Sequence, residues 1–346
     1  GERASYPESS DGAAIYWNRE GRLMALQCPF TREKANPLLT PADMPFENNG
    51  AFNPAVADLG DEIVLLLRIE RREGMSELRV ARSPNGVDNW EIADLPLLAP
   101  DHPEYPFEEW GCEDARVTRL ENGQWVIAYT AYGRYGPTVA LATTDDRFES
   151  VERIGSVTVP PNKNAALFPV KLDGRWLMLN RPETGGRPQI WYSFSHADDL
   201  DEWTLPGLLI PSHIGPWWDS TRIGAGAPPI RTKDGWLLIY HGAKAAAGTL
   251  TYRLGLALLD LDDPRKVIAR ASDWVFAPLE PYEVSGAAGN VVFTCGTALR
   301  DDEVWMYYGA ADTNVALARA KTDDLLEFVW RYNYLEQAGL DKGMVP

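Results

Sequence analysis

Short apolar runs alternate with polar turns along most of the chain, in a pattern typical of an all-β protein. Five segments share one arrangement, in which a Gly-containing or polar turn precedes an apolar and aromatic run: residues 61–70, 121–132, 173–181, 234–241 and 302–308. A second run with strand character follows each one, at residues 76–81, 138–142, 189–193, 252–257 and 314–318. Because continuous apolar runs indicate buried strands, we expect each first run to be the inner strand of a sheet.

These strand pairs recur about every 50 to 70 residues, which favours a radial array of small sheets over two sandwiches. The pattern predicts an all-β, five-bladed β-propeller over residues 50–322. Residues 1–49 are rich in Pro and Asn, and we interpret them as an N-terminal arm that wraps or closes the propeller, with a partly disordered tail as the alternative. Helical spacing of apolar residues from 323 onward predicts a C-terminal helical tail, residues 323–346, that packs on the propeller.

The chain is strongly acidic, with 50 acidic and 33 basic side chains among 346 residues and a formal net charge of -17. Such a surface repels polyanions, so nucleic acid and anionic membranes are not expected partners. A small anion would need a local group of basic side chains that opposes the overall field. Clustered Lys and Arg residues are therefore informative in this sequence.

Cysteine and histidine usage indicates neither disulfides nor a metal site. Cys28, Cys112 and Cys295 are far apart and form no CxxC pair, and the histidines lack metal-ligand spacing. No apolar run approaches the roughly 18 residues of a membrane span, and the N-terminal residues show no signal pattern. We expect a cytoplasmic protein without a metal, and leave a homo-oligomeric state open.

Polar side chains recur at or just before the predicted inner strands, where a propeller would bring them together at its axis. Arg181 and His241 each end an apolar strand, where burial without a partner costs several kcal/mol, so both favour a functional site. The complete set is Asn53, Arg68, Asp114, Lys163, Arg181, Arg222, His241 and Asp312.

Eight blocks of distinctive sequence lie in order along the chain. One is Gly-Cys-Glu-Asp-Ala-Arg at residues 111–116. The others are residues 50–55, 163–169, 223–230, 240–242, 258–261, 290–293 and 307–312. Eight collinear blocks are a far more specific signal than one, and together they resemble glycoside hydrolase family 130, the β-mannoside phosphorylases and related mannosidases.

The resemblance implies that Asp114 is the general acid of an inverting phosphorolysis. Phosphate would attack the anomeric carbon from the face opposite the leaving sugar, so no enzyme nucleophile or second catalytic carboxylate is needed. The proton would pass from the acid through a hydroxyl of the sugar. The structural alternative is that Asp114 is a turn residue paired with Arg116, which would lower its pKa and make it a poor acid.

The resemblance also implies an anion site and a sugar site. Cationic donors would neutralise phosphate, and the planar Arg fork suits it. The phosphate-binding positions would be Lys163, Arg181, Arg222, His241 and Tyr252. The substrate-binding positions would be Asn53, Arg68 and Asp312, with Asp219 and Glu283 nearby.

Three functions follow from this reading. The first is a β-mannoside phosphorylase that needs no cofactor, takes inorganic phosphate as co-substrate, and acts on β-1,2- or β-1,4-linked manno-oligosaccharides or mannosyl-glucose to give α-mannose 1-phosphate. The second is a β-mannosidase that uses water, with Glu283 or Asp312 as base. The third is a non-catalytic sugar-binding propeller.

Overall fold

A computed structural model describes residues 15–17, 23–25, 28–100, 102–183, 186–246 and 248–337. The described chain is nearly all β-structure, with helices only at α1 (Pro281–Val284), α2 (Thr322–Arg331) and α3 (Tyr334–Gln337) and two 3-10 turns, η1 (Pro41–Asp43) and η2 (Pro106–Glu108). None of these helices has the length and apolar content that a bilayer crossing requires. The predicted all-β class is confirmed.

The first half of the chain forms two antiparallel groups of strands. One contains β4 (Gly50–Asp58), β5 (Ile63–Glu70), β6 (Ser76–Ser83) and β7 (Glu91–Ile92) in sequence order. The other contains β8 (Gly111–Arg119), β9 (Trp125–Gly133), β10 (Gly136–Thr144) and β11 (Val151–Ser156). A single parallel pairing, Ser76 with Gly111, joins the groups into one eight-stranded sheet.

Three further sheets follow. The first contains β12 (Asn162–Leu167), β13 (Leu177–Pro182), β14 (Ile190–Ser195) and β15 (Trp203–Ile210). The second contains β16 (Arg222–Ala225), β17 (Ile230–Arg231), β18 (Trp236–Ala246), β19 (Thr249–Leu259) and β20 (Val267–Arg270). The third contains β21 (Val292–Arg300), β22 (Glu303–Ala310), β23 (Asn314–Lys321) and β3 (Thr31–Arg32). Strands β1 (Ile15–Trp17) and β2 (Leu23–Ala25) form a separate pair.

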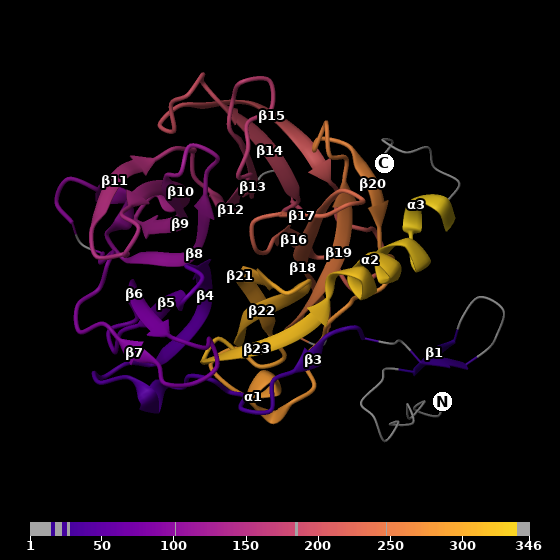
Figure 1. The fold of residues 1–346 in the computed structure, drawn as a ribbon, viewed down its shortest axis with the longest axis horizontal. Coiled ribbons are helices and arrows are strands. Elements are labelled where there is room, and N and C mark those ends of the chain that lie inside the picture. The colour runs from indigo at the N-terminus through magenta and orange to yellow at the C-terminus, as the bar shows by residue number, and fades with distance from the viewer. Residues whose placement is uncertain are drawn as a thin grey trace.

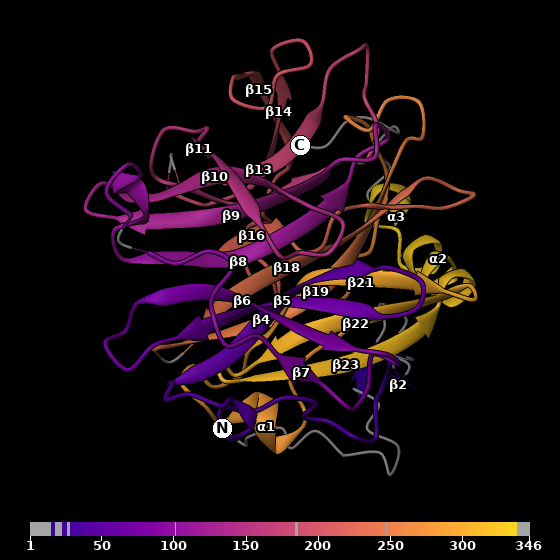
Figure 2. The same ribbon diagram turned by 60° about the vertical axis from the view of Figure 1, so that its left-hand side comes forward.

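The strand groups surround a common centre, which gives a propeller-like arrangement (Figure 1). The first strand of each group is the innermost: β4 contacts β8 and β21, and β12 contacts β8 and β16. Strand β21 completes the circuit through contacts with β18 and β19. In a view turned by 60°, the strands of neighbouring groups stack as successive layers (Figure 2).

The expectation that the most apolar run of each repeat is the inner strand is wrong. Those runs are β5, β9, β13, β18 and β22, the second strands of their groups. The second strand is buried on both faces: Leu65 and Leu67 of β5 pack with Tyr307, whereas Val64 and Leu66 pack toward β8 and β9. The innermost strands read as more polar because they carry the side chains that face the central pocket.

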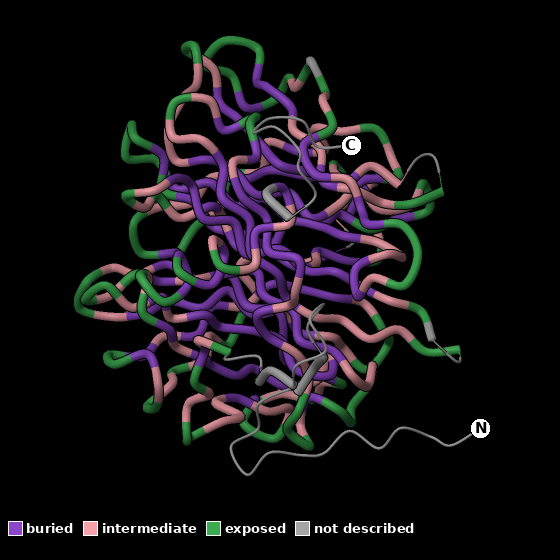
Figure 3. The backbone as a smooth tube through the Cα atoms, turned by 90° about the vertical axis from the view of Figure 1, so that its right-hand side faces the viewer, coloured by how far each residue is buried: buried purple, intermediate pink, exposed green. Residues whose placement is uncertain are grey.

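The core lies between the strand groups, and the exposed chain lies in the connecting loops (Figure 3). Burying a Leu, Ile or Val side chain stabilises the fold by roughly 1.5–3 kcal/mol. Because alternate residues of the second strands enter different clusters, each buried strand holds two neighbouring groups together.

Segments from both ends of the chain pack on the last sheets. Arg32 and Thr31 of β3 pair with Ala318 and Arg319 of β23, so an N-terminal strand completes the final sheet. Helix α2 contacts β19, β20 and β23 and buries Leu325, Leu326, Phe328 and Val329. Most of residues 1–27, predicted as the start of an arm, and residues 338–346 of the predicted tail lie outside the described residues.

Candidate active site

Three innermost strands carry a β-bulge at the same place, and each bulge presents a polar side chain to the centre. The strand registers shift between Phe52 and Ala55 in β4, between Glu113 and Arg116 in β8, and between Lys163 and Ala166 in β12. The bulges contain Asn53, Asp114 and Asn164, with φ of 46°, 48° and 56°. Asn and Asp tolerate this left-handed region better than other non-glycine residues, which explains their choice.

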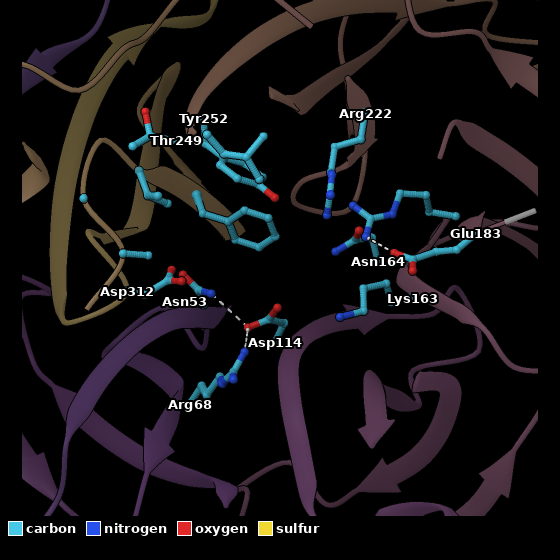
Figure 4. A pocket seen from close by; sticks show the side chains of 16 residues that line it. Asn53, Arg68, Asp114, Lys163, Asn164, Glu183, Arg222, Thr249, Tyr252 and Asp312 are labelled. Carbon is cyan, nitrogen blue, oxygen red and sulfur yellow. Dashed lines mark hydrogen bonds and ion pairs between the residues drawn. The ribbon is translucent and has the colours of Figure 1, made fainter. Parts of the chain in front are cut away.

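A cavity of about 590 Å³ opens at these bulges (Figure 4). Its walls come from every strand group, including the tight turn between β22 and β23 that holds Asp312 with φ of 48°. The lining residues are Asn53, Arg68, Asp114, Lys163, Asn164, Arg181, Glu183, Arg222, Thr249, Leu250, Tyr252, Ala288, Gly289, Val291, Phe293 and Asp312.

Asp114 is held by two neighbours from the first strand group. Its Oδ1 accepts a hydrogen bond from Asn53 Nδ2 at 2.9 Å and one from Arg68 Nη1 at 3.1 Å. The other guanidinium nitrogen of Arg68, Nη2, lies 3.2 Å from Glu113 Oε1. The predicted alternative, a pair with Arg116, does not form through the carboxylate, since Arg116 Nη1 donates to the backbone oxygen of Asp114.

The environment of Asp114 favours its charged form. Burial raises its pKa, but Arg68, Arg116, the Asn53 hydrogen bond and Lys163 together outweigh burial and hold the pKa below its usual value. To act as a proton donor, Asp114 must be protonated, which requires a change in its surroundings that raises its pKa. An anion bound among the nearby cations would offset their field and raise the pKa of Asp114 toward the range of an acid.

Asp312 lies in the same pocket with the opposite balance. Burial and the negative charge of Asp114 raise its pKa to about 6, although Arg68 opposes the shift. Asp114 is therefore ionised at neutral pH, while Asp312 titrates just below neutrality.

A basic group lies on the other side of the pocket from Asp312 (Figure 4). Arg181 is buried; its Nη2 donates to Glu183 Oε1 at 2.7 Å, and its Nη1 lies 3.4 Å from His241 Nε2. Within the described chain, the buried Nε atoms of Arg181 and Arg222 have no hydrogen-bond partner, and neither does Asn164 Oδ1. Buried polar atoms are normally paired, so these atoms point to a ligand.

His241 supports this basic group without lining the cavity. The ring is fully buried, and burial followed by the charges of Arg181, Arg116 and Arg222 holds its pKa well below the usual value. A neutral imidazole can accept a hydrogen bond from Arg181, whose guanidinium has only donors. His241 therefore positions Arg181; its buried Nδ1 has no hydrogen-bond partner among the described residues, and its direct contact with phosphate stays a prediction.

Two predicted substrate-binding residues, Asp219 and Glu283, lie away from the pocket, and their assignment is corrected. Asp219 is fully buried, accepts from Arg270 Nη2 at 2.7 Å, and lies 2.8 Å from His213 Nδ1. Glu283 is fully buried and accepts from Arg32 Nε at 2.8 Å and Tyr308 at 2.7 Å. Both carboxylates are saturated by structural partners, so neither can reach a sugar.

The sequence interpretation missed Asn164, Glu183 and Phe293. Asn164 follows Lys163 in a bulge equivalent to that of Asn53, a repetition that could have identified it. Glu183 follows Arg181 by two residues, but a carboxylate beside an expected anion site looks unfavourable. Phe293 reads as an ordinary strand residue; its ring centroid lies 4.4 Å from that of His241.

No group of three or more His, Cys, Asp or Glu side chains suited to a metal ion occurs among residues for which the structure gives positions. The pocket instead combines a buried acid, amide groups and four cations at the centre of a propeller-like all-β fold. That combination suits an enzyme that cleaves glycosidic bonds with the help of an anion.

Comparison with known proteins identifies the family. A family profile described as β-1,4-mannooligosaccharide phosphorylase matches residues 33–331, and the chain belongs to glycoside hydrolase family 130. The family resemblance inferred from the eight motifs is thereby confirmed.

Characterised relatives and solved structures support this family assignment. A 1,2-β-oligomannan phosphorylase of Thermoanaerobacter sp. (strain X514) is 40% identical over 72% of this chain and 80% of its own. A β-1,4-mannooligosaccharide phosphorylase of Ruminococcus albus is 33% identical over 86% of this chain and 90% of its own. The β-1,2-mannobiose phosphorylase of Listeria innocua, solved with β-1,2-mannobiose, superposes with a TM-score of 0.79 at 30% identity, over 87% of this chain and 99% of that one.

Proposed function

We propose that the protein is an inverting β-mannoside phosphorylase, which converts a β-mannoside and inorganic phosphate into α-mannose 1-phosphate and a shortened sugar. The observation that carries this proposal is the basic group beside Asp114: Arg181 and Arg222 each have a buried Nε without a partner among the described residues. Hydrolysis by water does not require a group of cations beside the general acid, whereas binding of phosphate does.

The proposed reaction proceeds in one displacement. Lys163, Arg181 and Arg222 hold phosphate so that one of its oxygens attacks the anomeric carbon from the face opposite the leaving sugar. As the new C–O bond forms, the old glycosidic bond breaks and its electron pair goes to the leaving oxygen. That oxygen takes up the proton of Asp114, relayed through a hydroxyl of the mannosyl unit.

The mannosyl unit is proposed to lie between Asn53, Arg68 and Asp312, which line the cavity beside Asp114. Asn53 Oδ1 has no hydrogen-bond partner in the described part of the protein and could accept from a sugar hydroxyl. Tyr252 would complete the phosphate side, since it lines the cavity and its ring lies near those of His241 and Phe293.

The preferred linkage is proposed to be β-1,2, because the 1,2-β-oligomannan phosphorylase is 40% identical to this chain, whereas the β-1,4-mannooligosaccharide phosphorylase is 33% and a mannosyl-glucose phosphorylase of Bacteroides fragilis 27% identical. We also propose that the strand groups around the centre are the five blades of one propeller.

Hydrolysis with Asp312 as base is the second candidate, because the pKa of Asp312 is raised to about 6. Glu283 is no longer a candidate base, since its carboxylate is saturated by Arg32 and Tyr308.

One assay separates the two reactions. β-1,2-Mannobiose, β-1,4-mannobiose and mannosyl-glucose are each incubated with the enzyme, with and without phosphate, and mannose and mannose 1-phosphate are quantified. We expect mannose 1-phosphate only when phosphate is present. Mannose release at equal rates without phosphate would establish the hydrolase instead.

The proposed acid is tested by Asp114→Asn, which preserves the shape of the side chain and its hydrogen bonds to Asn53 and Arg68. Loss of general acid catalysis should reduce kcat by about 10²–10⁴-fold. Thermal unfolding of the variant should remain near that of the wild type, and phosphate should bind at least as tightly, because the variant removes a negative charge from the pocket. A variant that retains wild-type kcat would remove Asp114 from the mechanism.

A further inference from the structure

Glu183 places a carboxylate in the otherwise basic side of the pocket. It follows the end of β13 and lines the same cavity as Lys163 and Arg222. In Figure 4 it points toward the centre of the basic group, beside Asn164. A negative charge at this position weakens the binding of any dianion, so its presence needs a compensating function.

The two oxygens of Glu183 have different surroundings. Oε1 accepts a hydrogen bond from Arg181 Nη2 at 2.7 Å, while Oε2 accepts none from the residues that the structure describes. The backbone holds the residue in place, because Glu183 N donates to Pro161 O at 3.0 Å. Arg181 and this backbone contact thus orient a carboxylate whose second oxygen is available to a ligand.

A carboxylate can only accept hydrogen bonds, so it binds well only to a ligand that carries a proton on its facing atom. Hydrogenphosphate carries one O–H group at neutral pH, as does hydrogenarsenate. Sulfate has nearly the same size, shape and charge, but at neutral pH it carries no proton. A carboxylate facing the anion therefore attracts hydrogenphosphate and repels sulfate.

We propose that Glu183 is a specificity residue that accepts the proton of hydrogenphosphate and thereby selects phosphate and arsenate over sulfate. The cations Lys163, Arg181 and Arg222 bind the unprotonated oxygens of the anion, with the unpartnered Nε atoms of the two arginines among the donors. Asn164 Oδ1, a second buried acceptor without a described partner, lies on the same side of the pocket. This inference rests on the proposed function, because it assigns phosphate to this group.

The charges in the pocket allow this arrangement. Four cations line the cavity: Arg68 is paired with Asp114 and Glu113, and Arg181 is paired with Glu183, which leaves Lys163 and Arg222. Two positive charges remain for the dianion, so the carboxylate lowers affinity for all dianions without abolishing it. Its hydrogen bond then restores affinity only for anions that carry a proton.

The test is Glu183→Gln. Arg181 will retain the amide oxygen of the glutamine as its acceptor, which turns the NH₂ group, a donor, toward the anion. Dissociation constants for phosphate, arsenate and sulfate are measured by calorimetry at pH 7.5, together with KM for phosphate and the inhibition constant for sulfate. We expect wild type to bind phosphate at least ten-fold more tightly than sulfate, because a hydrogen bond to a charged group contributes about 1.5–3 kcal/mol.

In Glu183→Gln this preference should fall by about ten-fold or more, mainly through tighter sulfate binding. Glu202→Gln, an exposed carboxylate outside the pocket, is the matched control and should keep the wild-type ratio. Glu183→Ala gives a second measurement if the Gln variant does not fold. An unchanged ratio of phosphate to sulfate affinity in the variants, or a wild type that binds the two anions equally, overturns the inference.

The binding measurements need no turnover, which separates this inference from the proposed function. Selective phosphate binding without phosphorolysis would refute the proposed reaction and keep the role of Glu183. Phosphorolysis by an enzyme that binds phosphate and sulfate equally would support the proposed reaction and refute the role of Glu183.

Discussion

Asp114 and Asp312 are carboxyl groups of one pocket with opposite electrostatic environments. Asp114 accepts hydrogen bonds from Asn53 and Arg68, and the cations around it lower its pKa. Asp312 accepts no comparable hydrogen bond from the part of the chain that the structure describes, and burial beside Asp114 raises its pKa to about 6. Because the negative charge of Asp114 raises the pKa of Asp312, Asp312 takes up a proton before Asp114 does as the pH falls.

Asp312→Asn should stabilise the protein at high pH. The folded-state pKa of about 6 lies above the ordinary value of 3.8, so wild type loses stability as pH rises through 6, whereas the neutral amide does not. The difference of about two units corresponds to about 3 kcal/mol, reduced to about 2 kcal/mol by partial exposure. Urea unfolding at pH 8 should therefore show a gain that disappears near pH 4.

Asp301→Asn is the control for this comparison. Asp301 has φ of 48°, the same value as Asp312, and it is exposed. Any benefit of Asn in the left-handed region would appear equally in both variants. A gain for Asp312→Asn that is the same at pH 4 and pH 8 would contradict the electrostatic explanation.

Individual site residues were predictable from the sequence to different degrees. Asp114 and Arg181 were found because they stand in specific motifs or at the ends of apolar strands. The structural alternative paired the Asp114 carboxylate with Arg116, but its hydrogen-bond partners are Asn53 and Arg68, which lie 61 and 46 residues away. Contacts of this kind depend on how separate strands meet, and no local pattern contains that information.

At the scale of elements, strand β16 can approach the site closely because Gly224 has no side chain. A Cβ on Gly224 would lie 2.5 Å from His241 Nε2 and 2.8 Å from Asn164 Oδ1. Both neighbours are buried and cannot move aside easily. The close approach of β16 therefore keeps His241 against Arg181 and Asn164 beside the basic group.

Gly224→Ala should displace His241 and Asn164 and thereby weaken the proposed phosphate site. We expect KM for phosphate to rise by about ten-fold and the free energy of unfolding to fall by about 1–3 kcal/mol, the usual cost of overpacking. Initial-rate kinetics with varied phosphate and thermal unfolding measure the two effects.

Gly111→Ala is the matched control, because its Cβ would meet its nearest atom, Glu113 Cγ, at an ordinary 3.4 Å. If Gly224→Ala leaves KM for phosphate at the value of this control, the packing of β16 does not position the anion site.

The strand pattern predicted the existence and approximate limits of these elements well. The apolar runs at 61–70 and 302–308 coincide with β5 and β22. Their order from the centre was assigned incorrectly, because hydrophobicity measures burial, and the strand nearest the axis is more polar than the strand behind it. The repeated bulges of β4, β8 and β12 also have no hydrophobic signature.

At the scale of the whole molecule, Glu283 of helix α1 forms an ion pair that holds the N-terminal strand β3 in place. Its carboxylate accepts from Arg32 Nε and Nη2, both at 2.8 Å, and from the backbone nitrogens of Leu279 and Glu280. Arg32 is 251 residues away in sequence. The family resemblance placed Glu283 near the sugar site, and no local pattern in the sequence reveals its distant partner Arg32.

Glu283→Gln should destabilise the fold and spare catalysis. Removing one charge of a buried ion pair leaves Arg32 uncompensated, so we expect a loss of about 3 kcal/mol in the free energy of unfolding. Glu327→Gln, which removes the exposed pair with Arg331, should change stability by less than about 1 kcal/mol. Chemical denaturation compares the two variants.

Kinetics of the same variants decide between a structural and a catalytic Glu283. Below its unfolding transition, Glu283→Gln should keep the kcat of wild type within about two-fold. A large loss of kcat in the folded variant would return Glu283 to the active site and support the hydrolase.

The shared bulge geometry of Asn53, Asp114 and Asn164 has a consequence for evolution. Each position already accepts an Asn or Asp in the left-handed conformation, so exchanging one for the other needs no rearrangement of the strands. A single nucleotide change in an Asn codon can produce Asp. The acid could thus migrate from one strand to another during descent, and new chemistry could arise around the same axis without a new scaffold.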